Sequence, residues 1–195
     1  SIDGIEEFSA AVEIGDVKVL VGYQYRFHPG LQKVKDLLQN NAIGEVVSAR
    51  SHWGEFLPGW HPWEDHRLGY SGRSDLGGGV VLTLSHSIDY LCWLLGEVEE
   101  IWAFSGNLGE LGVDVEDTAE IGMRFSKGTI GSIHLNYVQQ PPDHHLHLVG
   151  TGGTIKWDYS DGGVTLYRTE EENWQLFSIR DEFVRNDMLL AEMSH

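Results

Sequence analysis

The pattern of hydrophobic and polar residues divides the chain into a first part that alternates helix and strand and a second part rich in strands. Apolar residues recur at helical spacing in residues 5–13, 30–40 and 80–95. Residues 17–22 (VKVLVG) form a short apolar run that predicts a buried strand, and residues 45–56 predict a longer one. The alternation of helix and strand is typical of an α/β unit.

After residue 96 the pattern changes to short runs of β-branched, aromatic and aliphatic residues. The runs lie at 97–105, 117–125, 129–138, 144–149, 154–159, 163–168 and 174–179. Turn residues separate them at Ser126-Lys127-Gly128, Pro141-Pro142-Asp143, Gly152-Gly153 and Asp161-Gly162-Gly163. Together these elements predict an α/β (α+β) fold with a large, open, mostly antiparallel mixed sheet and helices packed on one face. Residues 184–195 predict a final helix.

Composition narrows the class of protein. Thirteen Lys and Arg residues against thirty Asp and Glu give a formal net charge of -17, which disfavours binding to nucleic-acid phosphates. No apolar run reaches the roughly 18 residues of a membrane span. Cys92 is the only cysteine, so no disulfide can form within the chain, and we expect a cytoplasmic protein.

Two motifs suggest ligands but fit local structure better. The glycines between Val149 and Thr154 resemble a dinucleotide-binding loop, yet a strand-like segment follows them where such a loop needs a helix, so a hairpin turn is favoured. On a strand, His145 and His147 would share one face and His144 the other. Two imidazoles do not complete a zinc site, and we expect no metal.

Residues 57–79 form a long irregular stretch of the kind that is usually functional or disordered. Tryptophans, tyrosine, histidines and arginines in it favour ligand contact over a flexible linker. The stretch ends at Gly77-Gly78-Gly79, which permits either close backbone packing or a phosphate at the start of the next helix. Both interpretations stay open.

The helix over 80–95 carries the strongest candidate chemistry. One side is aliphatic, whereas His86, Asp89 and Trp93 lie on nearly the opposite side. An imidazole and a carboxylate framed by aromatic rings suit a covered cleft, and histidine titrates near neutral pH. The plain alternative is a polar pair at a domain interface.

The order of several motifs resembles that of the Gfo/Idh/MocA oxidoreductases. The matching segments are residues 21–29 (VGYQYRFHP), 43–46 (IGEV), 77–96 with His86 and Asp89, 117–119 (DTA) and 150–154 (GTGGT). The resemblance implies a Rossmann domain that binds NAD or NADP, followed by a substrate-binding domain whose sheet mediates homodimers or homotetramers. Residues 1–24 would then be a remnant of the first domain and residues 25–195 the second, with the cofactor bound mainly outside this chain.

The resemblance also assigns roles. His86 matches an acid/base histidine near the substrate hydroxyl, and Asp89 an aspartate that positions it. Many relatives have a carboxylate one turn before that histidine; here Leu82 and Thr83 stand nearby, and Thr83 offers a hydroxyl instead. Tyr25 and Arg26 match residues that contact cofactor or substrate. The further candidates for substrate binding are Trp63, Arg67, Tyr70 and Arg73.

Two functions follow as hypotheses. The first is the substrate domain of an oxidoreductase that transfers hydride between a nicotinamide cofactor and a sugar, amino-sugar or sugar-nucleotide alcohol. The second is a non-catalytic module of the same family that binds ligands or assembles, which the missing carboxylate near position 82 or 83 supports.

Overall fold

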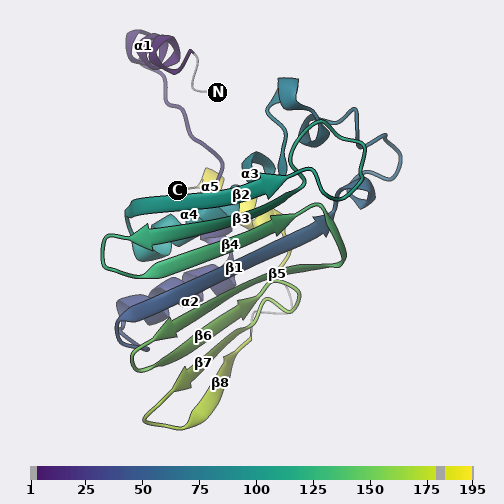
Figure 1. Cartoon of the computed structure of the whole chain (residues 1–195). Helices are drawn as coiled ribbons and strands as arrows, with labels where there is room; N and C mark the ends of the chain where they lie inside the picture. The colour runs from purple at the N-terminus through teal and green to yellow at the C-terminus, as the bar shows by residue number, and fades with distance from the viewer. Residues whose placement is uncertain (1–3, 179–182, 195) are drawn as a thin grey trace.

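The computed structural model describes residues 4–178 and 183–194. Its centre is one eight-stranded sheet with the order β2-β3-β4-β1-β5-β6-β7-β8 (Figure 1). The strands are β1 (Val46–Phe56), β2 (Val98–Gly106), β3 (Thr118–Phe125), β4 (Ile130–Asn136), β5 (Val138–Gly150), β6 (Gly153–Asp158), β7 (Val164–Arg168) and β8 (Asn173–Phe177). Only β1 and β4 pair in parallel; the other pairs are antiparallel. The predicted open, mostly antiparallel sheet is confirmed.

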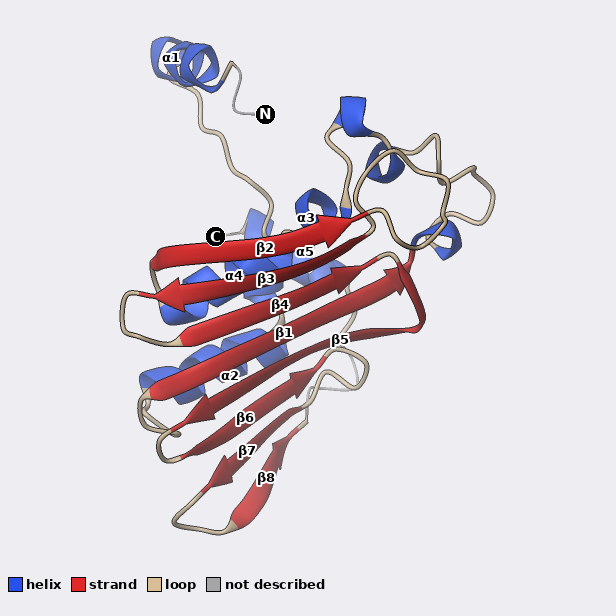
Figure 2. Ribbon diagram, in the orientation of Figure 1, coloured by secondary structure: helices blue, strands red, loops and turns tan. Residues whose placement is uncertain are grey.

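Helices cover one face of this sheet and leave the other open (Figure 2). They are α2 (Pro29–Gln39), α3 (Val80–Thr83), α4 (His86–Leu95) and α5 (Asn186–Met193), with a 3-10 helix η1 (Gln24–Phe27) before α2. In α2 the helical spacing buries Leu31, Val34 and Leu37. The His28 side chain accepts a hydrogen bond from Gly30 N at 3.0 Å and so caps the helix, while Pro29 occupies its first turn.

Side chains along the strands alternate between the face covered by helices and the open face. On β5, His144, Leu146 and Leu148 are buried under the helices, whereas His145 and His147 lie on the open face. The predicted separation of His144 from the other two histidines is therefore confirmed. The Gly152-Gly153 segment joins β5 to β6 as a hairpin, as the sequence indicated.

The N-terminal part differs from expectation in one respect. Helix α1 (Ile5–Gly15) is present, but it stands away from the sheet (Figure 1). Residues 17–22 form no strand, and Val17, Val19, Leu20 and Val21 are each more than half exposed. The prediction of a buried strand there is wrong for this structure, because no described strand lies beside the segment to pair with its backbone.

Two further boundaries were wrong. The single helix predicted over 80–95 is two helices, α3 and α4, separated at Leu84 and Ser85. The predicted turn at Pro141-Pro142-Asp143 lies inside β5. Prolines are tolerated there because β6 pairs with β5 only from His145 onward, so that side of the strand needs no backbone donor. Residues 179 and 195, at the ends of predicted elements, lie outside the described residues.

Candidate functional site

His86 begins α4 and lies among aromatic rings. Its ring centroid is 4.9 Å from that of Tyr25 and 5.7 Å from that of Tyr23, both from the segment that leads into α2. Trp53 of β1 lies 5.9 Å away. Burial lowers the pKa of His86 from its usual value, although the charge of Asp89 opposes the shift. The imidazole is therefore held neutral near neutral pH.

Asp89 does not orient His86, contrary to one expectation from the sequence. Both of its carboxylate oxygens accept hydrogen bonds from Arg26: Nε donates to Oδ2 at 2.9 Å and Nη2 to Oδ1 at 2.5 Å. The Asp89 side chain is only 6% exposed and that of Arg26 is 42% exposed. His86 Nδ1 is buried and makes no hydrogen bond within the described residues. The ion pair of Arg26 with Asp89 instead connects η1 to α4.

A buried polar network lies behind the ring of His86. The phenol of Tyr90 contacts Ser51 Oγ, lies 3.2 Å from Ser87 Oγ and lies 3.3 Å from His144 Nε2. His144 in turn stacks on Trp53, with 4.0 Å between ring centroids and 5° between planes. Burial lowers the pKa of His144 well below its usual value. His144 thereby links this network to Trp53, one of the rings beside His86. In the sequence, only the alternation of the strand around residue 144 indicated that His144 is buried.

The expected hydroxyl of Thr83 does not reach His86 either. Thr83 Oγ1 is buried and makes no hydrogen bond of normal geometry to any residue that the structure describes. It lies beside the phenol of Tyr137, whose own hydroxyl donates to Gly79 O at 2.9 Å. Gly79 adopts a φ of 111°, and a Cβ there would meet the Glu116 carboxylate. A side chain would meet neighbouring atoms at Gly78 and Gly79, whereas at Gly77 it would meet none within 4 Å.

The loop candidates lie at the surface and are held by local pairs. Arg67 bonds Asp65, with Nη2 to Oδ2 at 2.6 Å, and Arg73 bonds Asp75 at 2.5 Å. Trp63 is 76% exposed and Tyr70 59% exposed. No contact among the described residues joins these four to His86. Their role in substrate binding stays a prediction.

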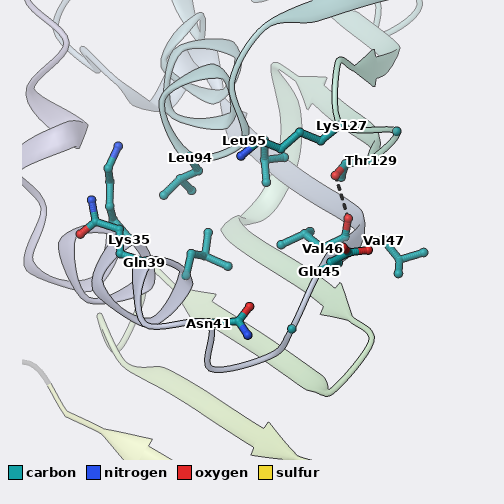
Figure 3. A pocket seen from close by; sticks show the side chains of 13 residues that line it. Lys35, Gln39, Asn41, Glu45, Val46, Val47, Leu94, Leu95, Lys127 and Thr129 are labelled. Atoms are coloured by element: carbon teal, nitrogen blue, oxygen red, sulfur yellow. Dashed lines mark hydrogen bonds between the residues drawn. The ribbon is translucent and has the colours of Figure 1, made fainter.

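Hollows in the surface lie elsewhere. The first, of about 690 Å³, opens between the ends of α2 and α4 and the start of β1, with Lys35, Gln39, Leu94 and Lys127 in its lining (Figure 3). Lys35 Nζ is already engaged, because it donates to Trp93 O at 2.8 Å and lies 4.1 Å from the centre of the Trp93 ring. A second of about 710 Å³ and a third of about 400 Å³ adjoin β7. His86 lines none of these three.

The described residues contain no group of three or more His, Cys, Asp or Glu side chains placed to hold a metal ion. The glycines at 150–153 form a hairpin, not the strand-to-helix turn that binds a dinucleotide. No single described helix is long and apolar enough to cross a membrane.

Comparison with known proteins identifies relatives of this chain. A 2,7-anhydro-N-acetylneuraminate hydratase of Escherichia coli is 26% identical over 186 residues, covering 88% of this chain and 48% of the relative. An inositol 2-dehydrogenase of Rubrobacter xylanophilus is 29% identical over 150 residues, covering 75% and 40%. The chain thus spans about half or less of the length of these relatives.

Solved structures share the fold. The apo form of levoglucosan dehydrogenase superposes with a TM-score of 0.81 at 19% identity, covering 96% of this chain and 59% of that one. An Agrobacterium radiobacter oxidoreductase, in complex with NAD+, L-tartaric acid and magnesium, gives 0.80 at 18% identity, covering 100% and 58%. The family model of the GFO/IDH/MocA C-terminal domain matches residues 31–156. This chain therefore belongs to the Gfo/Idh/MocA family and contains its C-terminal domain.

Proposed function

We propose that this chain is the substrate-binding domain of an NAD(P)-dependent oxidoreductase that transfers hydride between nicotinamide and a sugar-type alcohol. The observation that carries the proposal is the environment of His86: a neutral imidazole, partly buried, at the start of a helix and walled by aromatic rings. A neutral histidine accepts a proton readily, and aromatic faces pack against sugar rings.

The proton step belongs to this chain. Because His86 Nδ1 is buried, Nε2 is the ring nitrogen left to accept the proton of a substrate hydroxyl. Its lowered pKa keeps that nitrogen free at neutral pH. The nicotinamide, when bound, supplies the hydride chemistry. Asp89 stabilises the site through Arg26 and adds a negative charge that favours the imidazolium.

The dinucleotide would be held by a neighbouring unit of a longer protein, to which residues 1–24 would belong. Helix α1 and the segment after it support this division, since they carry exposed apolar side chains away from the sheet: Ile5, Phe8, Ile14, Val17, Val19, Leu20 and Val21. Residues 25–195 would then form the substrate domain. Tyr25 and Arg26 stand at the junction, where the proposed cofactor and substrate meet.

The proposed substrates are sugars, amino sugars or sugar nucleotides. Relatives named levoglucosan dehydrogenase, inositol 2-dehydrogenase and 2,7-anhydro-N-acetylneuraminate hydratase support a polyhydroxylated ring. Arg26 and the loop residues Trp63, Arg67, Tyr70 and Arg73 are the proposed contacts. The two loop arginines would exchange their neighbouring aspartates for substrate groups.

A second copy of the chain is proposed to cover the open face of the sheet, giving a homodimer or homotetramer. Large apolar side chains at both edges of this face support association. On β2 they are Trp102, 54% exposed, and Phe104, 77% exposed; on β8 they are Trp174, 46% exposed, and Leu176, 63% exposed.

The second candidate function is a ligand-binding or assembly module without catalysis. Within the described residues His86 Nδ1 has no hydrogen-bond partner and Asp89 pairs with Arg26, and both observations favour this module. In such a module the residues around His86 would bind a sugar without converting it.

The experiment that separates the two uses the full-length protein with NAD+ or NADP+ and a panel of sugar alcohols, followed by nicotinamide absorbance. His86→Gln should lower kcat by roughly 10²- to 10⁴-fold, the usual contribution of general acid–base catalysis. The matched control is His134→Gln, which removes an imidazole from the open face of the sheet. No turnover by the unaltered protein, or equal kcat for the two variants, would reject the proposed role.

A further inference from the structure

Arg185 stands at the start of α5, beside the 3-10 helix η1. Helix α5 packs against η1, which contains Tyr25. Just before Arg185, the ring of Phe183 lies 5.1 Å from the ring of His28. Just after it, Met188 is completely buried. These contacts hold the start of α5 on the helix-covered side of the sheet, not on the open face proposed for a second copy (Figure 2).

The charge of Arg185 reaches the proposed site. Burial sets the direction of two pKa shifts there, raising the pKa of Tyr25 and lowering that of His86, and the positive charge of Arg185 acts on both groups. The two rings lie 4.9 Å apart at their centroids. Because interactions between charges weaken with distance, Arg185 belongs to the surroundings of His86. The sequence gave no sign of this, since the two residues are far apart in the chain.

Arg185 has no counter-charge among the residues that the structure describes. It is exposed and forms no ion pair with any of them. Arg26 differs, because both carboxylate oxygens of Asp89 accept hydrogen bonds from it. A cation at the start of a helix is also disfavoured by the helix dipole. The stability of α5 therefore does not explain an arginine at this position.

Two further carboxylates lie nearby, and both keep their charge. Asp187 accepts a hydrogen bond from a backbone N–H in the first turn of α5 at 3.1 Å. Glu55 accepts one from the indole two residues before it in β1, at 2.7 Å. The charge of Glu55 acts on Tyr25 but, among the described residues, those that act on His86 are Asp89 and Arg185. An anion is therefore favoured close to the guanidinium, between Arg185 and His86.

We propose that Arg185 binds the carboxylate of a sugar acid whose hydroxyl faces His86. This inference deepens the proposed function and rests on it, because it names the class of sugar. A guanidinium offers two parallel donors that match the two oxygens of one carboxylate. A phosphate carries up to two charges and would call for a second free cation, whereas Arg26 is already engaged by Asp89.

A bound carboxylate would also change the chemistry of His86. It offsets the positive charge of Arg185, which opposes protonation of the imidazole, and leaves the charge of Asp89, which favours it. The imidazole then becomes a stronger base when the sugar acid is in place. Arg185 would thus select the substrate and couple its binding to the proton step.

The test is a set of binding titrations of the full-length protein with pairs of methyl glycosides. Each pair consists of a methyl hexuronide and the methyl hexoside of the same configuration (gluco, galacto or manno), which differ only in a carboxylate in place of a hydroxymethyl group. At least one uronide should bind about tenfold or more tightly than its hexoside, as expected for charge-assisted hydrogen bonds. Arg185→Gln should abolish this preference and leave the Kd of the hexoside unchanged.

Two variants serve as controls. Arg185→Lys keeps the charge without the two parallel donors and should retain only part of the preference. Arg168→Gln should retain all of it, because Arg168 already pairs with Glu171 at 2.8 Å. Urea denaturation of each variant checks that the fold is intact.

The proposal is overturned if no uronide binds more tightly than its hexoside, or if Arg185→Gln weakens both members of a pair alike. It is also overturned if Arg185→Gln weakens the binding of NAD+ or NADP+ and leaves the preference for the uronide intact, because the anion is then a cofactor phosphate. A preference that depends on Arg185 in a protein without turnover would support the Arg185 site and reject hydride transfer. The two proposals therefore fail separately.

Discussion

Arg26 encloses the carboxylate of Asp89 with two hydrogen bonds, although the residues are 63 positions apart in the chain. Arg26 belongs to η1 and Asp89 to α4, so this pair fixes the segment before α2 against the helix that carries His86. One partner is nearly buried and the other is partly exposed. The geometry favours a stabilising pair, since a two-pronged guanidinium meets both oxygens of a desolvated carboxylate.

Breaking this pair should therefore destabilise the fold. We expect Asp89→Asn to reduce the free energy of unfolding by about 1–3 kcal/mol, because it leaves a partly buried guanidinium without its counter-charge. The measurement is urea denaturation. Arg67→Gln is the matched control, because its pair with Asp65 lies at the surface, where ion pairs contribute little to stability. Equal losses in the two variants would contradict the structural importance of Asp89.

The hydroxyl of Tyr90 should contribute to the stability of the fold through its buried hydrogen bonds. Tyr90→Phe keeps the ring but removes the hydroxyl that joins Ser51, Ser87 and His144. Leaving those buried groups with fewer partners should cost about 1–3 kcal/mol, read from chemical denaturation. Tyr70→Phe, at an exposed phenol, should change stability by less than about 0.5 kcal/mol. If Tyr90→Phe leaves the free energy of unfolding unchanged, the hydrogen bonds of the Tyr90 hydroxyl do not stabilise the residues around His86.

Stability should fall in mild acid because of His28. Burial lowers the pKa of this imidazole to about 4, whereas the unfolded chain titrates near 6.5. Between these values the unfolded state binds more protons, so stability is intact above about pH 6.5 and is lost as the pH falls toward 4. The loss from this group is on the order of 3 kcal/mol.

The matched variant for this pH effect is His28→Asn, which keeps a side-chain cap for α2 but does not titrate. Free energies of unfolding measured from pH 7.5 to 4 should show a shallower decline in the variant. The buried His144, whose pKa is also lowered, should leave part of the decline in place. An unchanged slope would show that His28 is protonated in the folded state as easily as in the unfolded chain.

Gly30 should not tolerate a side chain, despite its position in a helix. A Cβ there would overlap the Trp157 ring and lie 2.9 Å from Gly162 O. Replacing glycine by alanine within a helix normally stabilises the protein by about 1 kcal/mol. A destabilising effect of Gly30→Ala would therefore indicate the overlap with the Trp157 ring. We expect Gly30→Ala to lower Tm, with a cost of about 1–3 kcal/mol from overpacking. Gly15→Ala, whose Cβ would lie 3.7 Å from its nearest neighbour, Val17 Cγ1, should leave Tm unchanged or raise it.

The sequence alone determined the elements that depend on short-range periodicity. The strands from 97 to 177, the hairpin at Gly152-Gly153 and the helix after Pro29 follow from alternation, turn residues and capping, which act over a few residues. The same local pattern failed for residues 17–22, because a strand exists only with a paired neighbour, and for Pro141-Pro142, because pairing on one side of β5 ends before them. Both depend on distant parts of the chain.

The tertiary structure decided which side chains meet. His86 and Asp89 are one turn apart in sequence, and that spacing favoured a pair between them, yet Asp89 turns to Arg26 and His86 packs against Tyr25 and Trp53. Strand order likewise placed Arg50, His147 and Lys156 in one row, although they come from three different strands. Periodicity assigns a residue to a face of its own element; only the packing and register of elements assign its neighbours, because these contacts close long loops between distant segments.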